Sequence, residues 1–276
     1  MNESILVLEA SLEEQAVPMG MEPAEGSRQN RSGIALDKAT GETAWTSPGD
    51  SANWSARYGS YASPVPCDVD GIRCAVLFGP VAVNLVEVAS GRVLCSFVHQ
   101  DNMHPMADPV VSAGHVFVCS PDFFPLLLDM ASAEPLRLWQ NDRLQTGMTS
   151  PLLVRGFLYG CHYDGQSFPN LGWGELQRAK MPLRCVEWET GKFMWESEPM
   201  SSATLTASDG KLILLESNGT LRIAEASPEG YREISSADVL AGEKRPRRFV
   251  TAPVLCRGRF YCRNFAGDLI CVDVSK

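Results

Sequence analysis

Short apolar runs separated by glycine-containing turns recur along the chain. Four of them begin with a proline before an apolar residue or pair and a fifth is a weaker copy: Ser63-Pro64-Val65, Asp108-Pro109-Val110-Val111, Ser150-Pro151-Leu152-Leu153, Ala252-Pro253-Val254-Leu255 and Ala203-Thr204-Leu205. A glycine follows each after five to seven residues, at Gly71, Gly114, Gly156, Gly258 and Gly210. Because glycine accepts the positive φ that tight hairpin turns need, each pattern predicts a strand, a turn and a second strand.

Two further strands complete the unit. Asn218-Gly219 before Leu221 and Gly267-Asp268 before Leu269 predict turns into a third strand. A Thr-Gly or Ser-containing turn then leads to a fourth, outer strand, in four copies of unequal strength that end at Trp45, Cys95, Trp139 and Trp195. We interpret Trp45, Trp139 and Trp195 as large apolar plugs that dock neighbouring sheets against each other.

The spacing of the repeats predicts the architecture. The prolines at 64, 109 and 151 lie 45 and 42 residues apart, and periods of about 40 to 50 residues with four strands each are typical of β-propellers. One blade cannot bury both faces of its sheet, so blades must stack. We expect a single all-β domain of about six four-stranded antiparallel blades, the first and last incomplete, at 1–50, 51–100, 101–143, 144–199, 200–245 and 246–276. Polar insertions at 11–32, 164–182 and 231–248 are expected to be surface loops.

The string from Ala35 to Trp45 resembles the quinoprotein repeat, in which an aliphatic-Asp strand, a Thr-Gly turn and a tryptophan dock adjacent blades. The segment from Arg259 to Val274, with Leu158-Tyr159-Gly160, is similar to bacterial PQQ-like β-propeller repeat proteins of the kind grouped with BamB-like outer-membrane assembly proteins. The resemblance covers nearly the whole chain. It implies a scaffold that binds a protein or peptide partner in the cell envelope or periplasm.

The two ends of the chain lead to a further expectation. The chain begins with a strand-like Ile5-Leu6-Val7-Leu8 that has no proline-containing predecessor, and it ends at Lys276 without a fourth strand. We therefore expect it to be the C-terminal part of a longer, eight-bladed propeller, with self-association through its open terminal blades.

Charge and hydropathy narrow the classes of partner. A formal net charge of -9 and a pI near 5.0 disfavour nucleic acid as a partner. The basic run from Lys244 to Arg248 is interpreted as a solvated loop, with a basic patch or localisation signal as the alternative. No apolar stretch approaches the roughly 20 residues of a membrane span, and no basic and apolar leader precedes the first strand. Localisation therefore stays open, because the resemblance implies the cell envelope or periplasm whereas this N-terminus shows no export signal.

The nine cysteines form no CxxC motif and no adjacent pair. We interpret them as small buried hydrophobes, with a disulfide between Cys256 and Cys262 across a hairpin as the alternative. Quinoprotein alcohol dehydrogenases, which the repeats resemble, hold their quinone against a disulfide of adjacent cysteines and bind calcium beside it. Since this chain lacks adjacent cysteines, we expect neither pyrroloquinoline quinone nor calcium as a cofactor.

No motif in the chain predicts a catalytic residue or a metal site. Asp68-Val69-Asp70-Gly71 resembles the start of a calcium loop but lacks the later oxygen ligands, so we interpret it as a hairpin turn. The candidates for a binding surface on the axial face of a propeller are His104, Asp108, His162 and Trp173, with a structural or solvated role as the alternative. Two functions follow: a non-catalytic scaffold for a protein or peptide, or an enzyme of the quinoprotein type that binds a quinone or sugar-like ligand in the axial funnel.

Overall fold

The computed structural model describes residues 5–9, 31–48, 60–99, 105–121, 123–147, 149–163, 180–239, 249 and 251–274. Within these ranges the regular secondary structure is entirely β, in six antiparallel sheets and one two-stranded pair. A helix long and apolar enough to cross a membrane does not occur in them. The chain forms two compact units, Met1–Gln140 and Asn141–Lys276, and each is described by itself.

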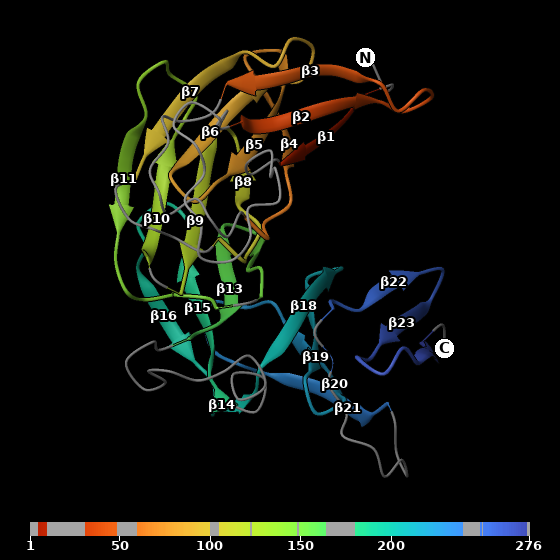
Figure 1. The fold of residues 1–276 in the computed structure, drawn as a ribbon. Helices are drawn as coiled ribbons and strands as arrows, with labels where there is room; N and C mark the ends of the chain where they lie inside the picture. The colour runs from red at the N-terminus through yellow and green to blue at the C-terminus, as the bar shows by residue number, and fades with distance from the viewer. Residues whose placement is uncertain are drawn as a thin grey trace, which may run out of the picture. The chain divides into compact units, whose positions relative to one another are not determined.

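The first unit contains three sheets (Figure 1). In each sheet the strands follow one another in sequence order, so that every strand pairs with the one before it. The strands are β1 (Ile5–Glu9), β2 (Arg31–Asp37) and β3 (Thr43–Pro48); β4 (Val65–Val69), β5 (Ile72–Phe78), β6 (Ala82–Glu87) and β7 (Val93–Val98); and β8 (Val110–Ser112), β9 (His115–Ser120), β10 (Phe123–Asp129) and β11 (Leu136–Gln140).

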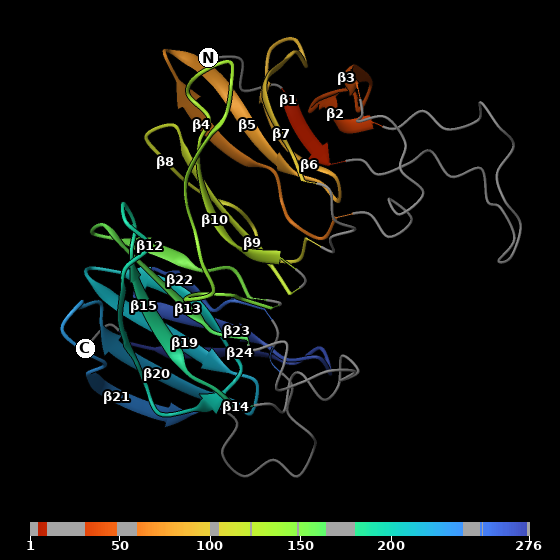
Figure 2. The same ribbon diagram turned by 90° about the vertical axis from the view of Figure 1, so that its left-hand side faces the viewer.

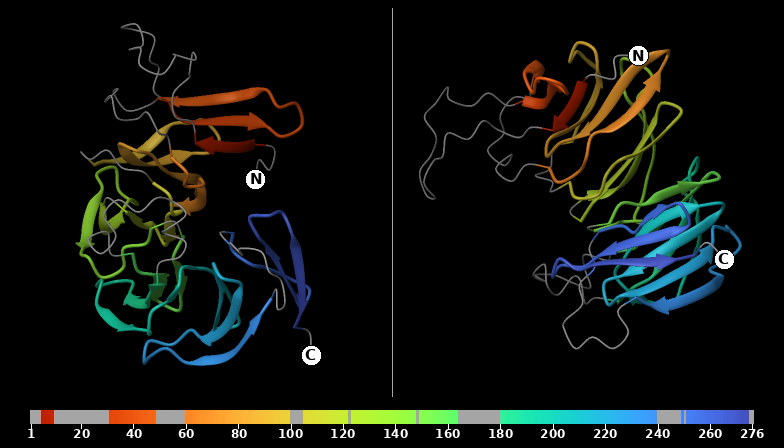
Figure 3. Two further views of the ribbon diagram at one scale, coloured as in Figure 1. Left: turned by 60° about the horizontal axis from the view of Figure 1, so that its bottom comes forward. Right: turned by 90° about the vertical axis from the view of Figure 1, so that its right-hand side faces the viewer.

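The second unit repeats this plan three times (Figure 2). Its strands are β12 (Leu152–Val154), β13 (Phe157–Cys161), β15 (Leu183–Glu187) and β16 (Phe193–Glu196); β18 (Ala203–Ser208), β19 (Lys211–Glu216), β20 (Thr220–Glu225) and β21 (Glu233–Asp238); and β22 (Val254–Cys256), β23 (Arg259–Arg263) and β24 (Leu269–Asp273). A short pair, β14 (Lys180–Met181) with β17 (Met200–Ser201), lies beside them. The sheet of β22 to β24 is the dark blue element in Figure 3.

Each of the six predicted blade ranges contains one of these sheets. Four sheets have four strands, and the first and the last have three. The predicted all-β architecture of four-stranded antiparallel propeller blades is therefore confirmed. That the chain forms one domain stays a prediction.

The first hairpin of every described sheet from β4 to β24 turns on two residues that both have positive φ, apart from the short pair β14 and β17. At Asp70-Gly71 the φ values are 49° and 78°, and the same holds at Ala113-Gly114, Arg155-Gly156, Asp209-Gly210 and Arg257-Gly258. Positive φ at both central residues defines a type I′ turn, whose twist matches that of the paired strands. The sequence pattern predicts the glycine of each turn but not the positive φ of the residue before it.

The register corrects one of the proline positions. Pro109, Pro151 and Pro253 each lie five residues before the turn glycine. In the sheet of β4 to β7 the proline at this position is Pro66, which lies inside β4, whereas Pro64 precedes the strand. Pro64 therefore lies two residues before Pro66, the position equivalent to Pro109, Pro151 and Pro253.

A β-bulge interrupts the pairing of the last two strands at the same place in five of the six described sheets, all except β22 to β24. In the three-stranded sheet β1 to β3, the strands β2 and β3 correspond to the third and fourth strands of the other sheets. The shifts lie between Ala35/Leu36, Leu85/Val86, Leu127/Leu128, Cys185/Val186 and Ile223/Ala224. The fourth-strand residues that pair just beyond the bulge are Trp45, Cys95, Trp139, Trp195 and Ser235. The strong and weak copies of the closing motif are therefore structurally equivalent.

Apolar side chains from neighbouring sheets form the cores. In the first unit, Cys74 and Val76 of β5 pack with Val116 and Val118 of β9. In the second unit, Leu212 and Leu214 of β19 face the sheet of β12 to β16, while Ile213 and Leu215 face the sheet of β22 to β24. Alternate residues of the second strand in a sheet thus pack against the sheets on its two sides, which explains why second strands are nearly continuous apolar runs.

One predicted loop is in fact a strand. The insertion at 231–248 contains β21, which pairs with β20 from Thr220↔Asp238 to Ala224↔Glu233. All six residues of β21 are exposed, and Ile234 is its only large apolar residue. Because no face of β21 is buried, its sequence lacks the alternation that marks a strand. Of the other two insertions, 11–30 and 164–179 lie outside the described residues.

Candidate functional site

Two of the four residues predicted for an axial binding surface, Asp108 and His162, are held in loop contacts. The Asp108 carboxylate accepts a hydrogen bond from the Ser63 backbone N–H at 2.6 Å. The ring Nδ1 of His162 accepts one from the Gln145 N–H at 3.1 Å, so a neutral His162 carries its proton on Nε2. His104 and Trp173 lie outside the described residues.

Asp108 belongs to the first unit and His162 to the second. His162 is only 8% exposed, and its backbone N–H donates to the Pro182 carbonyl at 2.9 Å. These contacts suit residues that fix the loops beside inner strands. A shared binding surface for the four candidates stays a prediction.

The calcium-like segment is a hairpin turn. Asp70 and Gly71 supply its two central residues, and the Asp68 carboxylate lies 2.8 Å from Nη1 of Arg73. In the part of the chain that the structure describes, no three His, Cys, Asp or Glu side chains gather as metal ligands would. The basic run 244–248 lies outside that part.

Two of the tryptophans contact the sheet that follows their own. Nε1 of Trp45 donates to the Val88 carbonyl at 2.9 Å, and an added Cβ on Gly91 would lie 2.6 Å from the indole. Nε1 of Trp195 likewise donates to the Ser227 carbonyl at 2.9 Å. In both cases the acceptor follows the third strand of the next sheet. Their role as plugs stays a prediction.

Trp139 contacts a ring of its own sheet. Its ring centroid lies 5.6 Å from that of Phe117, with the two planes 46° apart. Phe117 is fully buried on the second strand of the same sheet. The docking role predicted for Trp139 stays a prediction.

None of the nine cysteines is in a disulfide, and six are buried. The alternative disulfide between Cys256 and Cys262 is wrong, because Cys256 pairs with Arg259 and Cys262 pairs with Ile270. Cys256 and Cys271 are exposed on the last sheet.

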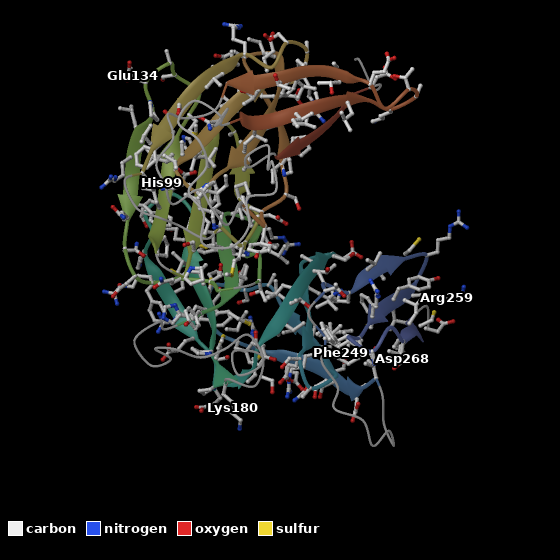
Figure 4. All side chains as sticks on the ribbon, viewed as in Figure 1. His99, Glu134, Lys180, Phe249, Arg259 and Asp268 are labelled. Carbon is white, nitrogen blue, oxygen red and sulfur yellow. The ribbon has the colours of Figure 1, made fainter. Side chains whose placement is uncertain are left out.

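Among the described residues of the second unit, other side chains cover only one face of the last sheet, β22 to β24. Phe260 and Cys262 on its covered face pack with Ile213, Leu215 and Phe249, and Figure 4 labels Phe249 on the side toward β18 to β21. The other face, here called the open face, carries Val254, Cys256, Arg259, Tyr261, Arg263, Leu269, Cys271 and Asp273.

The open face exposes large apolar side chains. Val254 and Leu269 are 59% and 69% exposed, and Phe265, in the turn after β23, is 74% exposed. The positions equivalent to Tyr261 in the preceding sheets are Ile213 and Tyr159, which are 2% and 0% exposed under the next sheet. The open face is thus the kind of surface that this repeat covers with another sheet.

Charges lie among the apolar residues of the open face. Nε of Arg259, labelled in Figure 4, lies 3.6 Å from the Asp273 carboxylate, and both side chains are about half exposed. Arg263 lies four residues further along β23, opposite Leu269. An apolar patch with such a rim is typical of a protein-binding surface.

The sequence pattern does not indicate the open face. Phe260-Tyr261-Cys262 and Leu269-Ile270-Cys271-Val272 are apolar on both faces, as strands buried on both sides are. A pattern of this kind does not reveal which face is covered in the folded chain.

Comparison with known proteins shows likeness in fold alone. No protein-family model matches the chain, and no curated protein matches its sequence. Among solved structures, the computationally designed Ika8 protein is similar over 92% of this chain and 70% of its own, with a TM-score of 0.60 and 13% identity.

Two natural proteins are also similar. BamB from Moraxella catarrhalis matches over 90% of this chain and 79% of its own, with a TM-score of 0.46 and 16% identity. The quinohemoprotein alcohol dehydrogenase ADHIIG from Pseudomonas putida HK5 matches over 79% of this chain, which spans 42% of that protein, with a TM-score of 0.50 and 13% identity. At the level of the fold, the predicted resemblance to quinoprotein-type propellers is confirmed.

Proposed function

We propose that this chain is a non-catalytic scaffold of the propeller type that binds a protein partner through the open face of β22 to β24. The observation that carries the proposal is the exposure of Val254 and Leu269, 59% and 69%. Equivalent faces of the repeat are buried by a further sheet, so a protein surface is the natural complement.

The chemistry of the open face defines the partner. Val254, Tyr261 and Cys271 lie in one row across the three strands, because their register is Val254↔Tyr261↔Cys271. Arg259 and Arg263 point from the same face of β23. A partner segment with apolar side chains flanked by acidic ones would bury the row and meet the guanidinium groups.

The free side of β24 offers a second element of the same site. Among the described residues no strand pairs with β24 on the side where β7, β11, β16 and β21 complete their sheets. An extended partner segment could therefore add its backbone to β24 while its apolar side chains cover the row, as in other strand-addition complexes.

Photo-crosslinking in the native host tests this proposal. A photoreactive phenylalanine analogue at Leu269 should give a discrete crosslinked protein, and Val254→Asp in the same chain should remove it. The matched control places the analogue at Ile234, which is 52% exposed on β21. Equal crosslinking from both positions, or none from position 269 in a folded chain, would contradict the proposal.

A second assay tests whether the chain is non-catalytic. The purified chain is mixed with pyrroloquinoline quinone, calcium and candidate alcohol or sugar substrates, and reduction of an electron-accepting dye is followed. We expect no turnover above that of heat-denatured chain. Saturable turnover would overturn the scaffold assignment, whatever the crosslinking shows.

A further inference from the structure

Cys67 and Cys74 face each other across the first hairpin of the sheet β4 to β7. They are register partners on β4 and β5, and the turn between the strands is Asp70-Gly71. Partners in an antiparallel pair have Cα atoms about 4.5 or 5.5 Å apart, depending on whether they exchange hydrogen bonds. Both separations fall in the range of about 4.4 to 6.8 Å that a disulfide spans.

No other pair of cysteines has this relationship in the registers of the described strands. Cys95, Cys161 and Cys185 pair with Leu85, Leu183 and Trp195. Cys262 pairs with Ile270 and Cys271 with Tyr261, so these two thiols lie on opposite faces of their sheet.

The two thiols differ in access. Cys74 is buried in the core between the sheets β4 to β7 and β8 to β11, and Cys67 is half-buried at the edge of the same core. The Cys74 thiol donates to the Ile72 carbonyl at 3.4 Å. A small reagent can therefore reach Cys67 first, and Cys74 is the thiol positioned to displace it.

We propose that Cys67 and Cys74 form a reversible cross-strand disulfide, a redox modification site that is separate from the open face. The oxidant is a low-molecular-weight disulfide such as oxidised glutathione. The Cys67 thiolate attacks one oxidant sulfur, which breaks its S–S bond and releases one thiolate. The Cys74 thiolate then attacks Cys67 Sγ and releases the second. The two electrons and two protons leave with two molecules of reduced thiol.

The consequence is local stiffening. The bond would join β4 to β5 on the face that packs against the next sheet.

Burial, followed by the nearby Cys74 and Asp68, raises the pKa of Cys67 to about 11, although Arg73 opposes this. Burial likewise raises the pKa of Cys74. Both thiols are therefore mostly protonated near neutral pH, so their exchange with the oxidant is slow there and becomes faster at alkaline pH, because the thiolate is the attacking species.

Peptide mapping after redox titration tests the proposal. The reduced full chain is equilibrated in mixtures of reduced and oxidised glutathione, free thiols are alkylated, and the chain is digested with trypsin. Because Arg73 separates the two cysteines, cleavage gives peptides 58–73 and 74–92, each with one cysteine. We expect these peptides to be joined in oxidising mixtures and released by a reductant.

Variants separate this bond from general oxidation. Cys67→Ser and Cys74→Ser should each abolish the linked peptide, whereas Cys95→Ser, which removes a buried thiol of the same core, should leave it unchanged. The proposal is overturned if position 67 carries only a glutathione adduct at every ratio. Linkage of Cys67 to other cysteines as often as to Cys74 in a folded chain would also overturn it.

Discussion

The indole Nε1 of Trp195 donates a hydrogen bond to the Ser227 carbonyl at 2.9 Å and so joins the fourth strand of one sheet to the next sheet. Trp195 is 8% exposed and its ring contacts Tyr159 and Tyr231. Replacing a large core side chain with alanine leaves a cavity and costs about 3 to 5 kcal/mol. Trp195→Ala should lower the free energy of unfolding by that amount in urea melts.

The control for this prediction is Phe193→Ala on the same strand. Phe193 is 36% exposed, so its loss should cost much less than that of Trp195. A loss below about 1 kcal/mol for Trp195→Ala would show that the plug interpretation is wrong.

Gly91 and Gly41 occupy equivalent turns but differ in their surroundings. Their φ values are 75° and 74°, so alanine is strained at both, yet only at Gly91 would a Cβ meet Trp45, at 2.6 Å. Gly41→Ala should cost about 1 to 2 kcal/mol, the strain of a left-handed residue, and Gly91→Ala clearly more. In a Trp45→Ala background the excess at Gly91 should disappear in denaturant melts. If the excess persists there, the indole is not its cause.

The residue before each turn glycine offers a stabilising change. Ala113 has a φ of 50°, as do Asp209 and, at 49°, Asp70. Asparagine adopts this left-handed conformation more readily than alanine because its short side chain bonds locally. Ala113→Asn should raise the thermal midpoint, and Asp70→Ala should lower it. Opposite signs would contradict the assignment of type I′ turns.

Glu216 is the most buried carboxylate in a described ion pair. Its side chain is 3% exposed and lies 2.5 Å from Nε of Arg222, and it also accepts the Ser201 N–H at 2.9 Å. Losing bonds to a charged, buried group costs about 1.5 to 3 kcal/mol. Glu216→Gln should therefore destabilise the chain in urea melts.

Glu225→Gln is the matched control for Glu216. Glu225 pairs with Arg232 at 3.0 Å, but the two side chains are 46% and 61% exposed. Exposed pairs contribute about 0 to 1 kcal/mol, so this variant should be nearly neutral. Equal effects of the two variants would count against a buried role for Glu216.

Glu233 makes stability depend on acid pH. Burial alone would raise its pKa, but hydrogen bonds from Ser236, Arg222 and Tyr231 and the charge of Arg222 lower the pKa below its usual 4.5. The unfolded chain then binds the proton more readily, so this contribution is complete above pH 4.5 and is lost as pH falls through the lower folded value.

Thermal melts across pH values check the sign. Between about pH 5 and 3 the wild-type midpoint should fall more steeply than that of Glu233→Gln, and near neutral pH the two curves should run parallel. A variant whose midpoint falls as steeply as that of the wild type would contradict the lowered pKa.

The repeat could be predicted from the sequence because its turns and its sheet contacts require particular residue types. Glycines such as Gly156 are required by a positive φ, and Trp45 and Trp195 stand at one structural position, so each leaves a mark in the chain. Strand β21 has no such sequence signal, because it is held by backbone pairing to β20 and buries no side chain.

The candidate site was harder to predict for a related reason. Tyr261 and Ile213 have the same kind of sequence environment, and only the folded chain shows that one is covered and the other is not. The pairing of Cys67 with Cys74 also depends on register, which the offset of Pro64 from Pro66 had obscured.

The conserved place of the bulge between third and fourth strands governs how these sheets tolerate length changes. One extra residue, Ala44, Leu138 or Met194, stands between the paired positions on either side of it. Deleting that residue would leave the tryptophan opposite the same partner on the third strand but would remove the local bend and added twist that the bulge gives the fourth strand. The fourth strands should therefore accept many substitutions and almost no single-residue deletions, so that their mutational tolerance depends on residue count more than on residue type.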